Sequence, residues 1–411
     1  MKLPFHSANV LLPKNDFEHW SVIACDQYTS KPEYWQTTRE TVGNAPSTLN
    51  LIFPEVYLCK DDDGEIIKSI NTKMTEYLKN GIFTEYKDAL IYVERTQRDG
   101  RIRAGLIGAI DLDAYDFRPN AKCEIRATER TVMERLPARV AIRRGAEIEL
   151  PHVMMLIDDS EKTVIEPLSK LAETETPIYD FELMQGGGHL RGFLVPKPLH
   201  QTVFRGITAL KTHKDQILFA VGDGNHSLAS AKLAHEEAPN ELNKYALVEL
   251  VNLHSPALDF EPIYRVAENI DPEKFIKGFE DYLTRNGAKL LTETDRKIET
   301  MTFTLLYGET EKTIRVSNAP RAIAVACVQE YIDEEIAKNG GIQTDYIHGE
   351  DEVRELSARP QTVGFLYDCI TKDTLFESVE KEGVLPRKTF SMGNAYDKRY
   401  YTEARIIVPK P

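Results

Sequence analysis

The residues best suited to chemistry lie in the stretch Val221-Gly-Asp-Gly-Asn-His-Ser227. Asp223 and His226 are candidate catalytic residues, because a carboxylate can hold a cation or accept a proton, and an imidazole can bind phosphate or move a proton. Glycines open backbone angles that other residues avoid, and short polar side chains can sit beside an anion. On these grounds the candidate phosphate-binding residues of the loop are Gly222, Gly224, Asn225 and Ser227.

The elements on either side of this loop must position it. Ile217 to Val221 is an apolar run typical of a buried strand. After the glycines, Ser227 can cap a helix on which Leu228, Ala231, Lys232 and His235 recur at helical spacing. The amide groups of its first turn would then face the loop and favour a phosphate or carboxylate. The alternative is an ordinary turn that Asp223 closes through its own backbone.

A second junction of this kind occurs near the N-terminus. Trp20 to Cys25 reads as a strand, and a helix carrying Tyr34 and Trp35 follows the loop that begins with Asp26. Asp26 is therefore a third candidate catalytic residue, as the base that deprotonates a hydroxyl; Asp158 and Glu129 are alternatives for that role. Cys25 lacks a positive neighbour in the sequence that would lower its pKa, which disfavours a nucleophilic thiol.

Cations that could oppose a phosphate are spread along the chain. The stretch Lys122 to Arg144 mixes basic and acidic residues, which predicts a solvated helix with ion pairs, from which Arg126 and Arg130 could reach a phosphate. A glycine run, Met184 to Arg191, ends in the candidate Arg191, although a plain flexible turn is the default interpretation. The loop Pro386 to Ser391 offers Arg387 and Lys388 for phosphate binding or for loop decoration.

The remaining patterns predict an α+β (mixed α/β) fold. Residues 66–78 have helical spacing, 89–96 and 102–112 flank an Asp-Gly turn that predicts a hairpin, and Asp271 precedes a proline-initiated helix. Further strands are expected around 151–159, 245–253, 301–307 and 361–370, with helices at 322–337 and 375–381. We expect three segments: 1–118 as an N-terminal α+β segment, 119–260 as a central phosphate-loop core, and 261–411 as a C-terminal α+β segment.

Composition limits the class of protein. The chain has 411 residues, a formal net charge of −14, 42% hydrophobic residues and 28% charged residues, a balance typical of a globular protein. Its acidity disfavours nucleic acid and anionic membranes as partners. No apolar run reaches the length of a membrane span, and the N-terminus lacks a signal-peptide core, so we expect a cytoplasmic protein. An odd number of scattered cysteines (Cys25, Cys59, Cys123, Cys327 and Cys369) indicates neither disulfides nor a thiolate metal cluster.

Four motifs carry a family resemblance: Arg126-Ala-Thr-Glu-Arg-Thr-Val-Met-Glu-Arg135, Glu149-Leu-Pro-His-Val-Met-Met-Leu-Ile-Asp158, Phe219-Ala-Val-Gly-Asp-Gly-Asn-His226 and Gly383-Val-Leu-Pro-Arg-Lys388. Together they resemble the domain-of-unknown-function family number one thousand and fifteen over nearly the whole chain. The central loop is also similar to the phosphate loop of the ParB/sulfiredoxin superfamily, which includes partition proteins, sulfiredoxins and free-serine kinases. This likeness implies a ParB/sulfiredoxin-like core elaborated by N- and C-terminal α+β segments.

Departures from that superfamily narrow the chemistry. His226 falls where sulfiredoxins have a phosphate-binding histidine, but Asn225 replaces their cysteine, which excludes the sulfinic-acid reductase reaction. Ser227 stands where an arginine is usual, so the cation opposing a phosphate must come from elsewhere: Arg126, Arg191, Arg387 and Lys388 are the candidates. The acidic chain also lacks the basic element expected of a partition protein.

The leading functional hypothesis is a small-molecule phosphoryl-handling enzyme, a nucleotide-dependent kinase or related phosphotransferase. ADP or ATP with magnesium is the expected cofactor, the magnesium held through Asp223, and the resemblance to free-serine kinases implies serine or phosphoserine as the substrate. One alternative is a regulator that binds a nucleotide or metabolite without turnover. The other is a metal-dependent hydrolase using His152, His189, His226 and His254, although no close ligand motif supports it.

Overall fold

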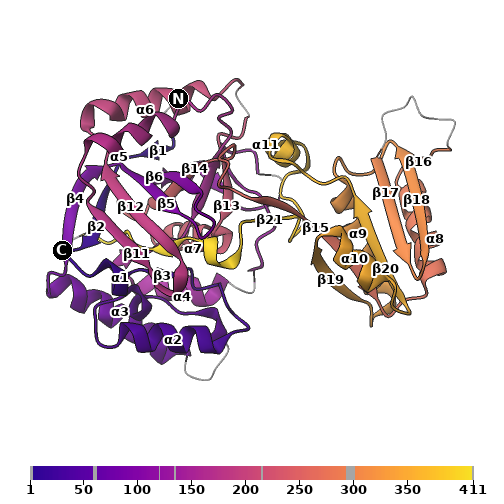
Figure 1. Cartoon of the computed structure of the whole chain (residues 1–411), viewed down its shortest axis with the longest axis horizontal. Coiled ribbons are helices and arrows are strands. Elements are labelled where there is room, and N and C mark those ends of the chain that lie inside the picture. Colours follow the sequence, from indigo (N-terminus) through magenta and orange to yellow (C-terminus); the bar gives the residue numbers. More distant parts are fainter. Residues whose placement is uncertain are drawn as a thin grey trace. The chain divides into compact units, whose positions relative to one another are not determined.

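The computed structural model describes residues 3–58, 63–119, 121–133, 136–213, 216–292 and 301–409. The chain forms two compact units, one made of residues 1–259 and 393–411 and the other of residues 260–392. Both units combine helices with sheets (Figure 1), so the predicted mixed α/β class is confirmed. The predicted three-segment division stays a prediction, as does the ParB/sulfiredoxin-like core.

The first unit is built around one large mixed sheet with strand order β11-β12-β5-β6-β14-β10-β13-β8-β7, and β1 pairs with β6. The central strand β10 runs parallel to β14 and antiparallel to β13, and β13 runs parallel to β8. The strands are β1 (Phe5–His6), β5 (Ile91–Thr96), β6 (Ile102–Asp111), β7 (Tyr115–Asp116), β8 (Ile125–Ala127), β10 (Met154–Ile157), β11 (Tyr179–Leu183), β12 (Gly188–Leu194), β13 (Phe219–Asp223) and β14 (Tyr245–Asn252).

Smaller elements surround this sheet. Three two-stranded sheets pair β2 with β4, β3 with β22 and β9 with β23. Their strands are β2 (Ala8–Pro13), β3 (Val22–Ile23), β4 (Phe83–Ala89), β9 (Ile148–Glu149), β22 (Tyr400–Tyr401) and β23 (Arg405–Ile406). The helices are α1 (Phe17–Trp20), α2 (Pro32–Val42), α3 (Asp63–Lys79), α4 (Leu136–Gly145), α5 (Leu171–Thr174), α6 (Lys197–Ala209) and α7 (Asn225–Glu237).

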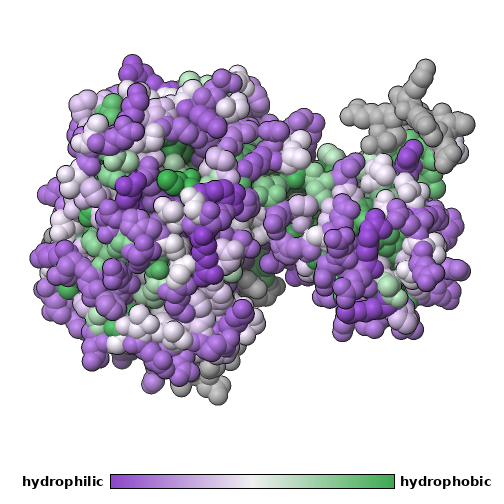
Figure 2. Space-filling model, viewed as in Figure 1, coloured by the Kyte–Doolittle hydropathy of each residue, from purple (hydrophilic) through white to green (hydrophobic). Residues whose placement is uncertain are grey.

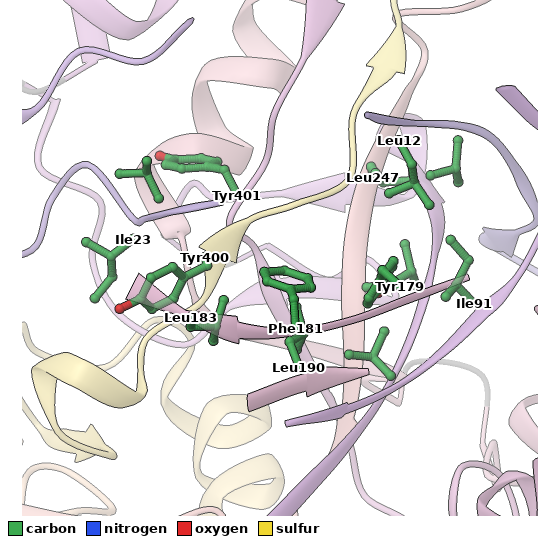
Figure 3. Close-up of a cluster of buried hydrophobic side chains, with 14 of the residues drawn as sticks. Leu12, Ile23, Ile91, Tyr179, Phe181, Leu183, Leu190, Leu247, Tyr400 and Tyr401 are labelled. Atoms are coloured by element: carbon green, nitrogen blue, oxygen red, sulfur yellow. The ribbon is translucent and has the colours of Figure 1, made fainter. Parts of the chain in front are cut away.

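The C-terminal segment 393–409 returns to the first unit and completes its core. Figure 3 shows Tyr400 and Tyr401 of β22 in a cluster of buried side chains with Ile23, Phe181 and Leu247. Because β22 and β23 pair with strands from the first half of the chain, the last residues are part of this unit rather than a tail.

Buried ion pairs fix the same segment in place. Arg399 Nε lies 2.9 Å from Glu249 Oε2, and Arg399 also pairs with Glu403; all three side chains are at most 5% exposed. Arg405 Nε lies 2.7 Å from Glu149 Oε1. Breaking one partner of such a pair leaves a charge without compensation in a low-dielectric interior, so these contacts hold the segment in one arrangement.

The second unit is an antiparallel sheet with order β16-β18-β17-β20-β15-β19, and β21 pairs with β15. Phe279 of α8 stacks edge-on against Phe303 of β17 with ring centroids 5.0 Å apart, and also contacts Tyr331 of α9, so these helices cover the apolar side of the sheet. The elements are β15 (Phe260–Glu268), α8 (Pro272–Arg285), β16 (Lys289–Leu290), β17 (Met301–Tyr307), β18 (Thr310–Ser317), α9 (Ala324–Asn339), β19 (Gln343–His348), α10 (Glu350–Ser357), β20 (Thr362–Tyr367), α11 (Lys372–Glu382) and β21 (Phe390–Met392).

The surface agrees with the composition. On the face seen in Figure 2, hydrophilic residues predominate over both units. Within the described ranges, every helix falls short of the length and apolar character that a bilayer span requires.

One predicted element is wrong. The charged stretch from Lys122 to Arg144 is not a single solvated helix: Arg126 lies in strand β8 and is 5% exposed, and α4 begins only at Leu136. Residues 134 and 135 of this stretch, like Cys59, lie outside the described residues. Strand pairing with β13 overrides the local charge pattern, because Arg126 stands opposite Ala220 in the sheet.

Candidate functional site

The predicted strand, glycine turn and helix around Asp223 are all present. Strand β13 ends at Asp223, helix α7 begins at Asn225, and Gly224 between them has φ 83° and ψ 25°, in the left-handed region. The Gly224 amide donates to Asp223 Oδ1 at 2.9 Å. A Cβ atom at Gly224 would lie 2.9 Å from Val153 Cα, so this position requires glycine both for its backbone angle and for the close approach of β10's entry.

Two details of the predicted loop are wrong. Gly222 does not form the turn, because it lies inside β13 and has no positive φ. Ser227 does not cap the helix, because α7 starts two residues earlier and its N-cap position is Gly224, with no side-chain hydrogen bond to the first turn. The left-handed glycine therefore ends the strand and starts the helix by itself, and leaves the N-terminus of α7 without a side-chain cap.

The charged groups of the loop have defined partners. Lys398 Nζ lies 3.6 Å from Asp223 Oδ2, and both side chains are less than one-fifth exposed. The ring of His226 accepts a hydrogen bond at Nε2 from the amide of Val132 at 3.1 Å. The cation expected from a distant part of the sequence is thus present, but it is Lys398 rather than one of the four predicted residues.

Arg126 lies beside the loop's strand but is engaged locally. Its Nε donates to the carbonyl of Cys123 at 2.8 Å. The next strand contact, from Thr128 Oγ1 to the carbonyl of Val221 at 2.7 Å, ties β8 to the end of β13. A phosphate-binding role for Arg126 stays a prediction.

The first turns of α7 open onto a cavity of about 110 Å³. Ser227 and Ser230 line it from α7, and Arg139 lines it from α4. Its other polar lining residues are Cys25, Glu55, Arg143, Glu149, His152 and Tyr401, and its apolar lining includes Leu51, Phe53, Met74, Ile142 and Ile148. The loop after β13 and the loop after β3, which the sequence singled out separately, therefore meet at one cavity.

Asp26 belongs to this site through His152. His152 Nε2 lies 3.7 Å from Asp26 Oδ2, and Gln27 donates to Asp26 Oδ1 at 3.0 Å. Burial alone would raise the pKa of Asp26, but the adjacent His152 ring and the hydrogen bond from Gln27 outweigh burial and lower it. Asp26 is therefore ionised at neutral pH.

The hydrogen bonds around His152 fix its orientation. Its Nδ1 lies 2.9 Å from the Tyr401 hydroxyl, which accepts from the Cys25 amide at 3.3 Å. We assign the Tyr401 hydroxyl as the donor to Nδ1, which places the ring proton on Nε2, on the side of Asp26. Asp26, His152 and Tyr401 then form a continuous polar chain from the loop after β3 to the C-terminal segment.

Cys25 does not have the properties of a nucleophile. Burial raises the pKa of its thiol to about 11, and the charge of Asp26 adds to the rise, whereas Arg139 opposes it. The positive neighbour that the sequence did not reveal is thus present in Arg139, but it does not overcome burial. The thiol stays protonated at neutral pH.

The other predicted cations lie elsewhere. Arg191 of β12 pairs with Glu94 of β5 at 2.6 Å, which occupies it within the large sheet. Arg387 and Lys388 belong to the second unit, where Arg387 Nε donates to the Tyr346 hydroxyl at 2.8 Å and both backbone carbonyls accept from Arg265. Their roles at the β13–α7 loop stay predictions.

The histidines named for a hydrolase are dispersed among the described residues. His189 pairs with Asp180 at 2.8 Å and His254 with Asp158 at 2.6 Å, while His152 faces Asp26. Within the part of the chain that the structure describes, no three histidine, cysteine or carboxylate side chains are placed to hold a metal ion. This arrangement gives no support to the metal-dependent hydrolase.

Comparison with known proteins places the chain in a family. A family model described as protein of unknown function (DUF1015) matches residues 4–335. No curated protein sequence matches the chain.

Solved structures show a distant likeness. A free serine kinase in complex with AMP is 16% identical, with a TM-score of 0.40 over 72% of this chain and 90% of that chain. A conserved hypothetical protein from Pyrococcus furiosus is 14% identical, with a TM-score of 0.38 over 72% and 93%. SbnI with C-terminal truncation from Staphylococcus aureus is 12% identical, with a TM-score of 0.36 over 70% and 83%. Likeness of this degree transfers no ligand and no residue role.

Proposed function

We propose a function from this chain's own residues, because it belongs to the DUF1015 family, whose members are described only as proteins of unknown function. The proposal is a phosphotransferase that acts on a small molecule and uses a nucleotide bound at the loop between β13 and α7. The observation that carries it is the position of Ser227, which lies in the uncapped first turn of α7 and also lines the cavity that holds His152 and Arg139. An anion site and a substrate-sized cavity are thus adjacent.

The loop fits a phosphate group. The first turn of α7 has no side-chain cap, so its amides and the positive end of the helix dipole can face an anion. Lys398 supplies a positive charge at Asp223, and His226 lies in the same turn. Phosphoryl transfer depends mainly on positioning and charge neutralisation, and backbone amides with one lysine can supply both.

The expected magnesium fits less directly. Asp223 already accepts from Gly224 and faces Lys398, so it can contribute one carboxylate oxygen at most. Magnesium commonly binds through one or two carboxylates together with substrate phosphates, so a single Asp223 contact is compatible with a metal that arrives with the nucleotide. A bound ATP would supply the phosphoryl group, and the ion would neutralise its phosphates.

Asp26 and His152 would handle the proton of the acceptor. Asp26 has a lowered pKa, so it stays ionised and orients the imidazole or accepts a hydrogen bond from an acceptor hydroxyl. His152 is held by Tyr401 on its other nitrogen, which prevents the ring from turning away. The resemblance to free-serine kinases makes serine and phosphoserine the first acceptor and product to test.

A thermal-shift screen with ADP, ATP, serine and phosphoserine, with and without magnesium, tests the proposal. A ligand at a hundred times its Kd should raise the Tm of the binding unit by roughly 5 °C. Lys398→Met should remove the nucleotide shift while leaving the Tm of the unliganded protein near the parent value, since Lys398 makes a partly exposed contact.

Transfer itself needs a separate assay. Incubation with ATP labelled in the terminal phosphate should yield a phosphorylated acceptor, and Asp26→Asn should reduce that yield without abolishing the nucleotide shift. Nucleotide binding without transfer to any acceptor would favour the non-catalytic regulator. If no nucleotide or phosphometabolite shifts the parent protein, the proposed function is wrong.

A further inference from the structure

The cavity below α7 has a definite capacity. It measures about 110 Å³, on a scale where one enclosed water needs about 10–15 Å³, so it holds roughly seven to eleven non-hydrogen atoms. This is too small for a nucleotide and suits a metabolite of the size of a small amino acid.

Two opposite charges line this cavity side by side. Arg139 of α4 pairs with Glu55, and their side chains are 12% and 8% exposed. A desolvated pair of this kind is expensive to bury, and hydrophobic residues of the same volume often hold a fold as well. A ligand that carries a carboxylate and an ammonium presents the complementary charges to both members at once.

A third polar group in the cavity lacks a partner. His152 is 2% exposed and its Nε2 has no hydrogen bond within the described residues, since Asp26 at 3.7 Å is too distant for one. Buried polar atoms in native structures nearly always have partners, so an orphaned ring nitrogen in a cavity wall points to a ligand atom.

The rest of the wall is hydrocarbon. Leu51, Met74, Ile142 and Ile148 line the cavity beside the polar groups. Apolar walls gain from contact with methyl groups at roughly 25 cal/mol per Å² buried, and they gain nothing from a hydroxymethyl group that needs hydrogen bonds. The wall therefore favours an aliphatic side chain over one as polar as that of serine.

We propose that this cavity binds a zwitterionic α-amino acid with an aliphatic or partly aliphatic side chain. Its carboxylate binds Arg139, its ammonium binds Glu55, and its side chain packs on Leu51 and Ile142. His152 Nε2 donates to an oxygen of the ligand. The inference rests on the proposed function only in making this amino acid the phosphoryl acceptor, because binding itself needs no nucleotide.

Isothermal titration calorimetry with the full chain tests the charge requirement. The probes are valine, its deaminated analogue 3-methylbutanoate and its decarboxylated analogue isobutylamine, together with threonine and serine. We expect valine and threonine to bind more tightly than serine, and each single-charge analogue to bind on the order of tenfold more weakly than valine.

Variants test the residues. The double substitution Glu55→Gln and Arg139→Gln removes both charges without leaving one buried alone, and should weaken valine binding at least tenfold. The matched control is Arg144→Gln with Glu237→Gln, which removes an exposed ion pair of 2.7 Å from the same helix α4. The control should bind valine like the parent, and thermal denaturation checks that both double variants fold.

The outcomes separate this inference from the proposed function. If nucleotides bind the parent but no amino acid does, or if the Glu55 and Arg139 double variant is folded and binds valine normally, the cavity inference is wrong and the phosphate loop is untouched. Equal binding of valine and 3-methylbutanoate also overturns it, because the ammonium would then have no partner. If valine binds as expected and no nucleotide does, the inference stands and the phosphotransferase proposal fails.

Discussion

Replacing Gly224 by alanine should damage the loop in a way that can be measured against an internal standard. Gly224 has φ 83°, and an added Cβ would lie 2.9 Å from Val153 Cα and 3.2 Å from Val153 Cγ2. Gly100, in the hairpin between β5 and β6, has φ 85° but nothing within 4 Å of an added Cβ. Both glycines belong to the unit of residues 1–259 and 393–411, so one unfolding transition reports on both.

The magnitudes follow from that difference. Each alanine pays about 1–2 kcal/mol for the left-handed backbone. Gly224→Ala adds an overpacking term of about 1–3 kcal/mol because the contact is with backbone rather than with a flexible side-chain end. We therefore expect Gly100→Ala to lower the stability of the unit by about 1–2 kcal/mol and Gly224→Ala by about 2–5 kcal/mol.

Urea denaturation and ligand-induced thermal shift measure the two effects. At about 2–4 °C per kcal/mol, the Gly224 variant should melt several degrees below the Gly100 variant. It should also lose the nucleotide shift, because moving the start of α7 misplaces the amides of its first turn. Equal stability of the two variants would refute the close approach of Val153, and retained nucleotide binding by Gly224→Ala would refute the loop as the phosphate site.

Three further predictions concern buried ionisable groups. Because the pKa of the Cys25 thiol is raised to about 11, its alkylation followed by mass spectrometry should be slow at pH 7–8 and should accelerate as pH approaches 11; rapid labelling at pH 7 would contradict that burial. The lowered pKa of Asp26 adds stability that is present above its unfolded pKa of about 3.9 and is lost as pH falls below it, so the Tm deficit of Asp26→Asn should be largest near pH 7 and should shrink below about pH 4. Arg399→Met leaves Glu249 and Glu403 buried without their partner and should cost about 3–5 kcal/mol by urea denaturation, whereas a loss under 1 kcal/mol would show that solvent reaches the pair.

Local patterns predicted individual elements well. The Asp-Gly turn gave the hairpin of β5 and β6, which pair from Ile91 to Thr96 with Gly100 at positive φ. Asp271 caps α8 by accepting from the amide of Lys274, as its place before a proline predicted. Signals of this kind act over a few residues, so the folded protein has little scope to override them.

Patterns failed where tertiary contacts decide. Charge alternation predicted a solvated helix around Arg126, but that residue is needed as a strand next to β13, and pairing in the sheet dominates local preference. Ser227 is a good capping residue by type, but Gly224 reaches the left-handed conformation without strain and starts the helix earlier. Each error has the same cause, since a residue's neighbours in space were not its neighbours in sequence.

The candidate site shows the same limit. The sequence identified the loops of Asp223 and Asp26, because glycine and acidic residues at strand ends are visible in one dimension. It did not connect them, and it assigned neither Arg139 nor Lys398 to the site, because no local pattern distinguishes one surface lysine or arginine from another. Absence of a local arginine at Ser227 did correctly require a cation from a distant segment.

The dependence of the site on residues 393–409 explains why that cation lies so late in the chain. Strand β14 ends at Asn252, and the amide of Gly393 donates to the carbonyl of Asp259 at 3.1 Å, so the chain leaves and re-enters the first unit at one point. The returning segment then delivers Lys398 to Asp223 and Tyr401 to His152, while Arg399 between them is fixed by Glu249. Since Arg399 occupies a buried ion pair, its two neighbours on either side have little freedom, and the phosphate loop and the amino-acid cavity share one anchor. A change that loosens that anchor would therefore affect both proposed ligands together, whereas changes at Gly224 or Glu55 affect one ligand each.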